Sequence, residues 1–140
     1  MALPEHIHLE IVTPEKQVFS GMVDSITVSA TTGYMGVLPG HAPLLAELGI
    51  GEVGYKIGDK AEYLFCSWGF AEVLPEKVVL LAQTAEMASD IDVKRAEESK
   101  ARAEKRLASK DPGVDFARAE LALIRSISRL DAVKHRASRK

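Results

Sequence analysis

The sequence is poor in the residues that build disulfides and thiolate metal centres, because Cys66 is its only cysteine in 140 residues. A single cysteine excludes an internal disulfide and any metal site that needs several thiolates. Since Cys66 lies in an apolar, strand-like stretch, we expect it to be a small core residue. Long apolar runs are also missing, and none approaches the ~20 residues that a membrane-spanning helix needs.

Targeting and catalytic signatures are absent as well. The first residues show no cationic stretch followed by an apolar run, so we expect no signal peptide and a cytoplasmic location. The sequence contains no phosphate-binding P-loop, no Gly-x-Ser-x-Gly elbow and no His-Glu-x-x-His helix. None of the four histidines is accompanied in the sequence by both a nucleophile and an orienting group. The sequence therefore predicts a chain that is not itself an enzyme, with no catalytic residues and no metal site.

The composition is that of a globular protein, with 46% hydrophobic and 27% charged residues. The formal net charge of −2 conceals two oppositely charged segments. Residues 1–89 carry 4 Lys/Arg and 11 Asp/Glu, whereas residues 90–140 carry 14 and 9. An acidic first segment and a basic second segment indicate different partners for the two.

The first segment has the patterns of β-strands. Apolar residues alternate with polar ones, as in Ile7, Leu9 and Ile11, which buries one face of a strand. Gly58-Asp59 separates two such runs and predicts a two-residue hairpin turn. The continuous apolar run 78–82 predicts a buried strand. Many short strands with close turns indicate a compact β-sandwich or barrel.

The second segment has the composition of helices. Residues 90–110 contain no Gly or Pro and are rich in Ala, Glu, Lys and Arg. Ser89 and Asp92 resemble a capping box, so we expect the first helix to start near Asp90. Asp111-Pro112-Gly113 supplies the turn that ends it.

A second helix is predicted from about Asp115 to about His135. Its apolar stripe is expected to consist of Phe116, Leu123, Ile127 and Leu130. The first helix offers little beyond alanines to pack against this stripe, and short helices are marginal alone in water. The hairpin should therefore depend on other contacts for its position and is a credible mobile element. The predicted fold class is α+β, with a β-sandwich or barrel over residues 1–88 and an antiparallel two-helix hairpin over residues 89–140.

Three sequence motifs resemble those of a known family. They are Gly36-Val37-Leu38-Pro39-Gly40-His41-Ala42-Pro43-Leu44-Leu45, then Ser67-Trp68-Gly69-Phe70-Ala71-Glu72-Val73, and finally Ala85-Glu86 with Asp90-Ile91-Asp92 and Arg95-Ala96. The chain resembles the epsilon subunits of bacterial F-type ATP synthases over almost its whole length. Trp68 departs from the second motif, where the family usually has a glycine.

The resemblance implies a non-catalytic rotor part of the central stalk. In this family the β-sandwich binds the gamma subunit and rests on the membrane-embedded c-ring, coupling proton flow to ATP synthesis. The hairpin either folds against the sandwich or extends along gamma into the catalytic head of alpha and beta subunits, where it blocks ATP hydrolysis. Such a chain would lie on the cytoplasmic face of the inner (plasma) membrane and meet the membrane only through the complex.

Two partner surfaces follow from this resemblance. The segment 31–41 combines flexible glycines with exposed-looking side chains and suits a docking loop. Its candidate docking residues are Thr32, Gly33, Tyr34, Met35 and His41. The plainer interpretation is a turn that the sandwich requires. A basic face on the second helix, facing an acidic partner surface or simply solvent, consists of Arg118, Arg125, Arg129 and Arg136.

A nucleotide site is the third expectation. Some family members bind ATP on the folded hairpin without hydrolysing it, through a motif that reads Ile91-Asp92-Val93-Lys94-Arg95-Ala96 here. The candidate ATP-binding residues are Glu86, Ile91, Asp92, Arg95, Ala96, Arg102, Arg118, Arg125 and Arg129. Guanidinium groups suit phosphates and carboxylates suit the base or ribose. The alternative is that Asp92 caps the helix and forms an ordinary ion pair with Arg95. No cofactor is required, and no motif demands magnesium.

Two rival functions remain on the residues alone. One is a nucleic-acid-binding module that uses the basic second helix. The β segment argues against it, since its only positive residues are Lys16, Lys56, Lys60 and Lys77, and no nucleic-acid partner is expected. The other rival is a free-standing nucleotide sensor outside any ATP synthase.

Overall fold

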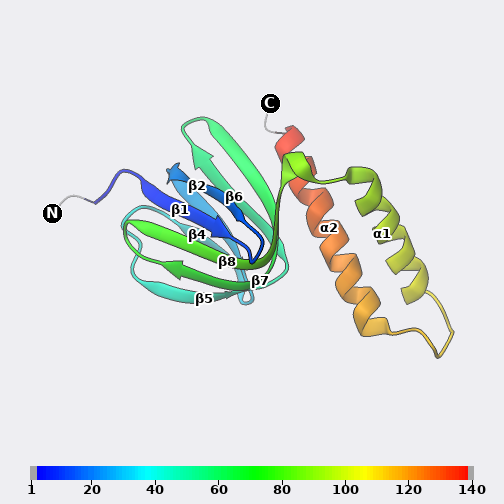
Figure 1. The fold of residues 1–140 in the computed structure, drawn as a ribbon. Coiled ribbons are helices and arrows are strands. Elements are labelled where there is room, and N and C mark those ends of the chain that lie inside the picture. Colours follow the sequence, from blue (N-terminus) through cyan, green and yellow to red (C-terminus); the bar gives the residue numbers. More distant parts are fainter. Residues whose placement is uncertain (1–2, 139–140) are drawn as a thin grey trace.

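The structure, a computed structural model, describes residues 3–138 and consists of a β domain with two helices beside it (Figure 1). The strands are β1 (Ile7–Val12), β2 (Gln17–Val23), β3 (Ser25–Ala30), β4 (Gly33–Val37), β5 (Leu44–Leu48), β6 (Gly51–Ile57), β7 (Lys60–Val73) and β8 (Lys77–Met87). The helices are a short 3₁₀ turn η1 (Ala88–Asp90), α1 (Val93–Leu107) and α2 (Phe116–Ser138). The predicted order, a β-sandwich followed by a helical hairpin, is confirmed.

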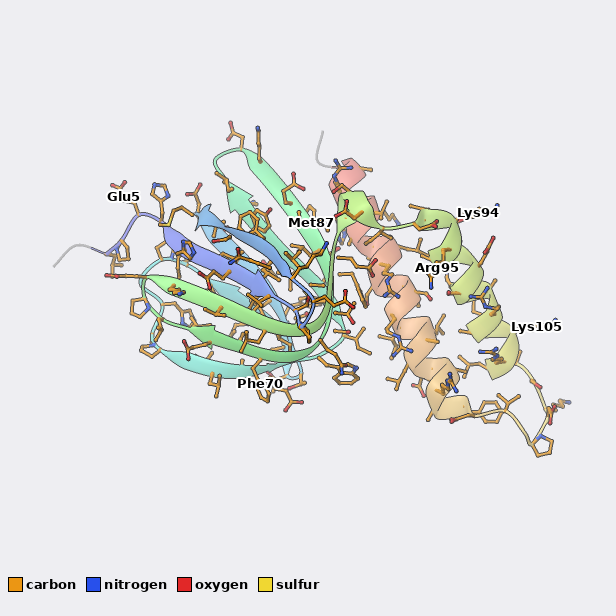
Figure 2. The ribbon with its side chains drawn as sticks, viewed as in Figure 1. Glu5, Phe70, Met87, Lys94, Arg95 and Lys105 are labelled. Carbon is orange, nitrogen blue, oxygen red and sulfur yellow. The ribbon has the colours of Figure 1, made fainter. Side chains whose placement is uncertain are left out.

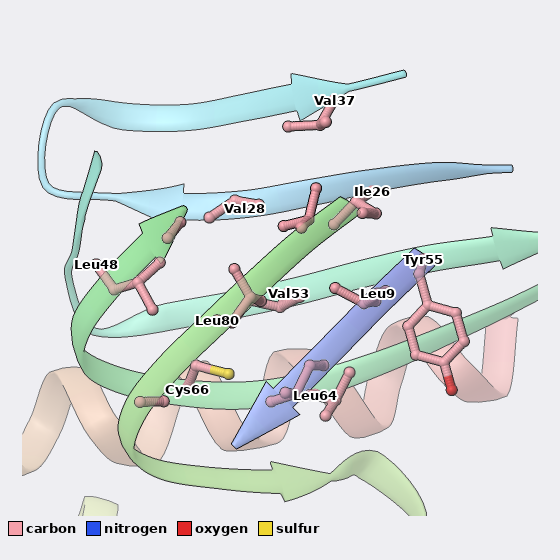
Figure 3. Packing of buried hydrophobic residues seen from close by; sticks show 14 of the residues in the cluster. Leu9, Ile26, Val28, Val37, Leu48, Val53, Tyr55, Leu64, Cys66 and Leu80 are labelled. Atoms are coloured by element: carbon pink, nitrogen blue, oxygen red, sulfur yellow. The ribbon is translucent and has the colours of Figure 1, made fainter. Parts of the chain in front are cut away.

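The strands hydrogen-bond in the order β2-β1-β8-β7-β5-β3-β4, and β6 pairs with both β3 and β7. All pairings are antiparallel except that of β1 with β8. The alternating apolar side chains meet between the layers, where Leu9, Val28 and Leu80 are fully buried (Figure 3). Cys66 lies in the same core with no exposed surface, as predicted.

A sharp bend interrupts the long strand β7 at Trp68 and Gly69. Trp68 has φ 51° and Gly69 has φ 140°, and both values lie in a region that L side chains rarely adopt. A Cβ atom on Gly69 would stand 1.8 Å from the carbonyl oxygen of Leu81, so only glycine fits there. Trp68 therefore holds a strained backbone position.

The prediction that residues 78–82 form a buried strand was wrong for one face. Val78 and Leu80 have no exposed surface, whereas Leu81 is 54% exposed. The run belongs to β8, which continues to Met87 and has one face in the core and the other outside. A continuous apolar run does not distinguish burial on both faces from an apolar outer face.

The first helix starts later than predicted. Asp92, rather than Ser89, is the N-cap of α1, because its Oδ1 accepts the backbone N–H of Arg95 at 3.0 Å. Ala88–Asp90 instead forms the 3₁₀ turn that joins the β domain to the helix. The N-cap-to-N3 hydrogen bond is the usual way to satisfy a free N–H of the first turn. The capping part of the plainer interpretation of Asp92 is thereby confirmed, whereas the ion pairs within residues 3–138 do not include one between Asp92 and Arg95.

The hairpin seam is built from small residues. The buried side chains of the described part of the two helices are Ala96, Ala103, Ala119, Ser126 and Ala132. The predicted apolar stripe is only partly buried, since Phe116 is 45% and Ile127 39% exposed. Because small side chains bury little apolar surface, the packing of the hairpin is thin, as expected.

The helix α2 lies between the β domain and α1 (Figure 1). It contacts β6, β7 and the 3₁₀ turn, and it packs along α1 over its length. The position of α1 therefore depends on α2, and the position of α2 depends on a few contacts with the sandwich.

Candidate functional site

Arg129 on α2 fastens the hairpin to the outer face of the β domain. Its Nε donates a hydrogen bond to Oε1 of Glu86 at 2.6 Å, and its guanidinium lies 4.2 Å from the centre of the Phe65 ring. Phe65 on β7 and Glu86 on β8 are direct cross-strand neighbours. One arginine thus combines a charge-assisted hydrogen bond with a cation–π contact.

A small apolar cluster lies beside this contact. Phe65, Ala88, Ile91 and Ala132 are buried together, with Tyr63 among the partly buried residues around them. The cluster brings together a strand, the 3₁₀ turn and α2, and it is separate from the main core. It is the principal apolar contact that holds the hairpin on the β domain.

A second polar contact fastens the last turns of α2. Nδ1 of His135 lies 2.7 and 2.8 Å from the two carboxylate oxygens of Glu52 on β6. The imidazole also packs against the ring of Tyr63, with 5.6 Å between the ring centres. The hairpin is therefore held at two points along α2, one at Arg129 and one at His135.

A cleft of about 310 Å³ opens where the β domain, the 3₁₀ turn and the two helices meet. Its lining residues are Glu86, Asp90, Ile91, Asp92, Arg95, Ala96, Ser99 and Arg129. In Figure 2, Arg95 lies on the side of α1 that faces α2, whereas Lys94 points away. Six of the nine predicted ATP-binding residues thus line one cleft.

The six residues differ in what they can offer a ligand. Ile91 and Ala96 are buried and form an apolar wall. Asp92 is already engaged as the helix cap, and Glu86 is paired with Arg129. Arg95 is exposed at the rim. Guanidinium groups carry five N–H donors, so Arg129 retains donors for an anion while it holds Glu86. The arrangement can bind an anionic group beside an apolar one.

The other three predicted ATP-binding residues do not line this cleft. Arg102 lies close to it, because its Nη2 donates to Oγ of Ser99 at 3.0 Å. Arg118 lines a different hollow near the interhelical loop, together with Arg106. Arg125 lines neither. The resemblance assigned these three arginines to the nucleotide site, and the lining of this cleft does not include them.

The predicted docking residues do not form one loop. Gly33, Tyr34 and Met35 belong to strand β4, and Thr32 is in the turn before it. Met35 packs partly against the core, whereas Tyr34 is 66% exposed. His41 follows the far end of the same strand and bonds through Nδ1 to the carbonyl oxygen of Ala42 at 2.7 Å. A strand of five residues therefore separates Thr32 from His41.

An apolar outer face of the β domain was missed by the sequence-based prediction. Leu45 on β5, Phe70 on β7 and Leu81 on β8 are 68%, 52% and 54% exposed. The backbones of Phe70 and Leu81 are paired neighbours, and β5 lies on the other side of β7. We name Leu45, Phe70 and Leu81 the outer apolar face. The sequence does not separate this face from a core face, because apolar residues occupy both alternating positions of residues 78–82.

Residues 3–138 contain neither a membrane-spanning helix nor a cluster of metal-ligating side chains. No helix there is long and apolar enough to cross a bilayer. Within the same residues, no three histidine, cysteine or carboxylate side chains gather as a metal site would require.

The fold and the cleft define a class of two-part proteins, in which a β-sandwich carries a helical hairpin held by few contacts. Residues 6–88 match the model of the ATP synthase delta/epsilon chain β-sandwich domain, and residues 89–134 match that of the delta/epsilon long α-helix domain. The chain belongs to the ATP synthase delta/epsilon chain family. The resemblance to bacterial epsilon subunits is thereby confirmed.

Individual relatives agree with this assignment. An ATP synthase epsilon chain of Bacillus cytotoxicus is 50% identical over 123 residues, which cover 88% of this chain and 92% of the relative. One of Desulforapulum autotrophicum is 44% identical over 135 residues, which cover 96% and 100%. Among solved structures, a chain of the Euglena gracilis mitochondrial ATP synthase (OSCP/F1/c-ring) has a TM-score of 0.82 at 26% identity, with 96% of this chain and 85% of that chain covered.

Proposed function

We propose that this chain is a rotor subunit of an F-type ATP synthase that binds gamma and the c-ring through its β domain. The match of both family models carries the proposal. The similar Euglena chain comes from an assembly of OSCP, F1 and c-ring. As such a subunit, the chain couples the catalytic head to the proton-driven ring, lies peripherally on the membrane through the complex, and performs no catalysis itself.

The outer apolar face is the candidate surface for gamma. Exposed apolar side chains on neighbouring strands are uncommon on monomeric proteins and are typical of protein interfaces. Co-purification with gamma of the same organism tests both the assignment and the surface. Phe70→Asp and Leu81→Asp should abolish capture, whereas Ile57→Asp, also exposed in the β domain, should retain it. Failure of the unmodified chain to bind gamma contradicts the rotor assignment itself.

ATP is the proposed ligand of the cleft lined by Glu86, Arg95 and Arg129. The volume of about 310 Å³ is at the lower end for ligand pockets, so part of the nucleotide would project into solvent. A ligand that bridges the β domain and both helices stabilises the docked hairpin by its differential affinity. No sequence motif requires magnesium for this role.

Isothermal titration of the full chain with ATP tests the site. Arg95→Ala should weaken binding about tenfold or more, because it removes a charged partner of a phosphate. Arg106→Ala on the same helix is the matched control, since Arg106 lies outside the cleft. Absence of heat at millimolar ATP, or equal losses for both variants, would contradict the site.

Restraint of ATP hydrolysis is the proposed role of the undocked hairpin. The docked form uses Arg129 internally, whereas Arg118 and Arg136 are exposed and available to an acidic surface of the alpha and beta subunits. Hydrolysis by the reconstituted complex should rise with Arg118→Glu and Arg136→Glu together. It should stay low with Lys105→Glu, a charge reversal on the other helix. Equal rates for all three complexes would exclude the basic face from inhibition.

A further inference from the structure

A groove separate from the nucleotide cleft lies between the β domain and the C-terminal half of α2. It has a volume of about 430 Å³ and shares no lining residue with the cleft around Arg95. Strands β3, β4, β6 and β7 form one side, and Ser128, Asp131 and His135 of α2 form the other. Neither side alone makes the groove.

The floor of the groove is open because its central position has no side chain. Gly54 on β6 pairs with Thr27 on one side and with Tyr63 on the other. A Cβ atom at Gly54 would stand 3.4 Å from the Tyr63 ring, so the ring already covers part of the strand. Ala61 and Ser25 at the margin are also small. The volume is thus a consequence of small residues on the outer face.

Two aromatic rings form walls. Tyr34 is 66% exposed, and its hydroxyl accepts the backbone N–H of Glu52 at 3.4 Å, so the ring from β4 reaches β6. Tyr63 packs against His135, with 5.6 Å between the ring centres. Tyrosine rings present negative faces to cations, and such contacts strengthen as water is excluded.

Within the lining, Asp131 is the carboxylate that favours a cation. The lining contains two carboxylates, Glu52 and Asp131, and one ammonium group, that of Lys56. His135 pairs with Glu52. Among the residues that the structure describes, Asp131 has neither a hydrogen bond nor an ion pair from its side chain. A bare metal ion does not suit the groove, because the described residues gather no set of three ligating side chains.

We infer that this groove binds a small organic cation, an ammonium or guanidinium group on a flat apolar body. The head group lies against Asp131 and the tyrosine faces, and the apolar body fills the space above Gly54. Because α2 supplies Asp131 and the strands supply the rings, an occupant stabilises the docked hairpin. The site therefore couples a second ligand to the same docking equilibrium as the nucleotide cleft.

Chemical-shift titration of the full chain with benzylammonium tests the inference, with benzyl alcohol as the uncharged probe. Benzylammonium should shift the amide signals of Tyr34, Gly54 and Tyr63 and bind at least about fivefold more tightly than the alcohol. Asp131→Asn should remove that preference, whereas Glu120→Gln, a neutralised carboxylate elsewhere on α2, should retain it.

Two results would overturn the inference. One is equal affinity for benzylammonium and benzyl alcohol, which would make the groove a neutral apolar site. The other is an unchanged preference for the cation in Asp131→Asn. A Tyr34→Leu variant gives an independent measurement, because Tyr34 is on the β domain and its loss should weaken cation binding without changing α2.

Discussion

Arg129 and Glu86 are 43 residues apart in sequence, yet the guanidinium Nε of one lies 2.6 Å from the carboxylate of the other. The pair joins the second helix to the β domain and forms one wall of the cleft proposed to bind ATP. A single contact therefore serves both the docking of the hairpin and the shape of its proposed site. A ligand that attracts either side chain changes the stability of the docked state.

Arg129→Ala should loosen the hairpin without unfolding the β domain. Loss of the half-exposed ion pair and the contact with Phe65 should cost about 1 kcal/mol, since exposed pairs are screened. Hydrogen exchange of the α2 amides should then be about fivefold faster. Arg125→Ala on the same helix is the control and should leave exchange unchanged. A uniform acceleration over the β core as well would show that the hairpin and β domain unfold together.

Asp92→Ala should destabilise α1 by about 1 kcal/mol, because the helix loses its N-cap acceptor. Asp92→Asn should be much milder, since asparagine caps as well as aspartate does. Urea unfolding followed by helical circular dichroism measures both. The comparison also separates two roles of Asp92: if Asn preserves stability but weakens ATP binding, then the charge acts on the ligand.

Trp68→Gly should stabilise the β domain by about 1 kcal/mol, because φ 51° is unfavourable for a bulky side chain. Gly69→Ala should have the opposite and larger effect, since its Cβ would meet the Leu81 carbonyl at 1.8 Å. Gly36→Ala is the control, as its Cβ would meet nothing within 4 Å. Thermal unfolding of the three variants checks the order, and a loss of stability in Trp68→Gly would mean that tryptophan contacts outweigh the strain.

Cys66 should react with thiol reagents only when the β domain unfolds. Burial raises the pKa of its thiol to about 12, so almost no thiolate forms at neutral pH, and the side chain has no exposed surface. The rate of labelling by a disulfide reagent should therefore follow unfolding as urea is raised. Fast labelling of the native chain would indicate that the core opens locally at β7.

Local patterns were sufficient to predict that the first segment forms β-strands. Alternation at Ile7, Leu9 and Ile11 and the turn at Gly58-Asp59 depend on neighbouring residues, and the structure confirms both. The start of α1 was predicted less well, because Ser89 and Asp92 are both good caps. The choice between them depends on Ile91, which is buried against the β domain. Local sequence does not contain that contact.

The sequence predicted part of the lining of the cleft but not its arrangement. The motif 91–96 and Glu86 come together because they are close in sequence at the end of β8. Arg129, by contrast, lines the cleft because α2 packs against the β domain. The same packing places Arg118 near the interhelical loop, outside the cleft. The exposure of Leu81 could not be predicted from the sequence either, because an exposed apolar strand face has the same composition as a core face.

Tyr55 should make stability fall at alkaline pH. Its burial, with a smaller effect of Glu62, raises the pKa of the phenol from 10.0 to about 12. Because the folded state holds the proton more tightly, this contribution is fully present below pH 10 and is lost as pH rises towards about 12. Urea unfolding at a series of pH values should show a steeper alkaline decline for the unmodified chain than for Tyr55→Phe. Identical declines would show that the Tyr55 phenol titrates alike in both states.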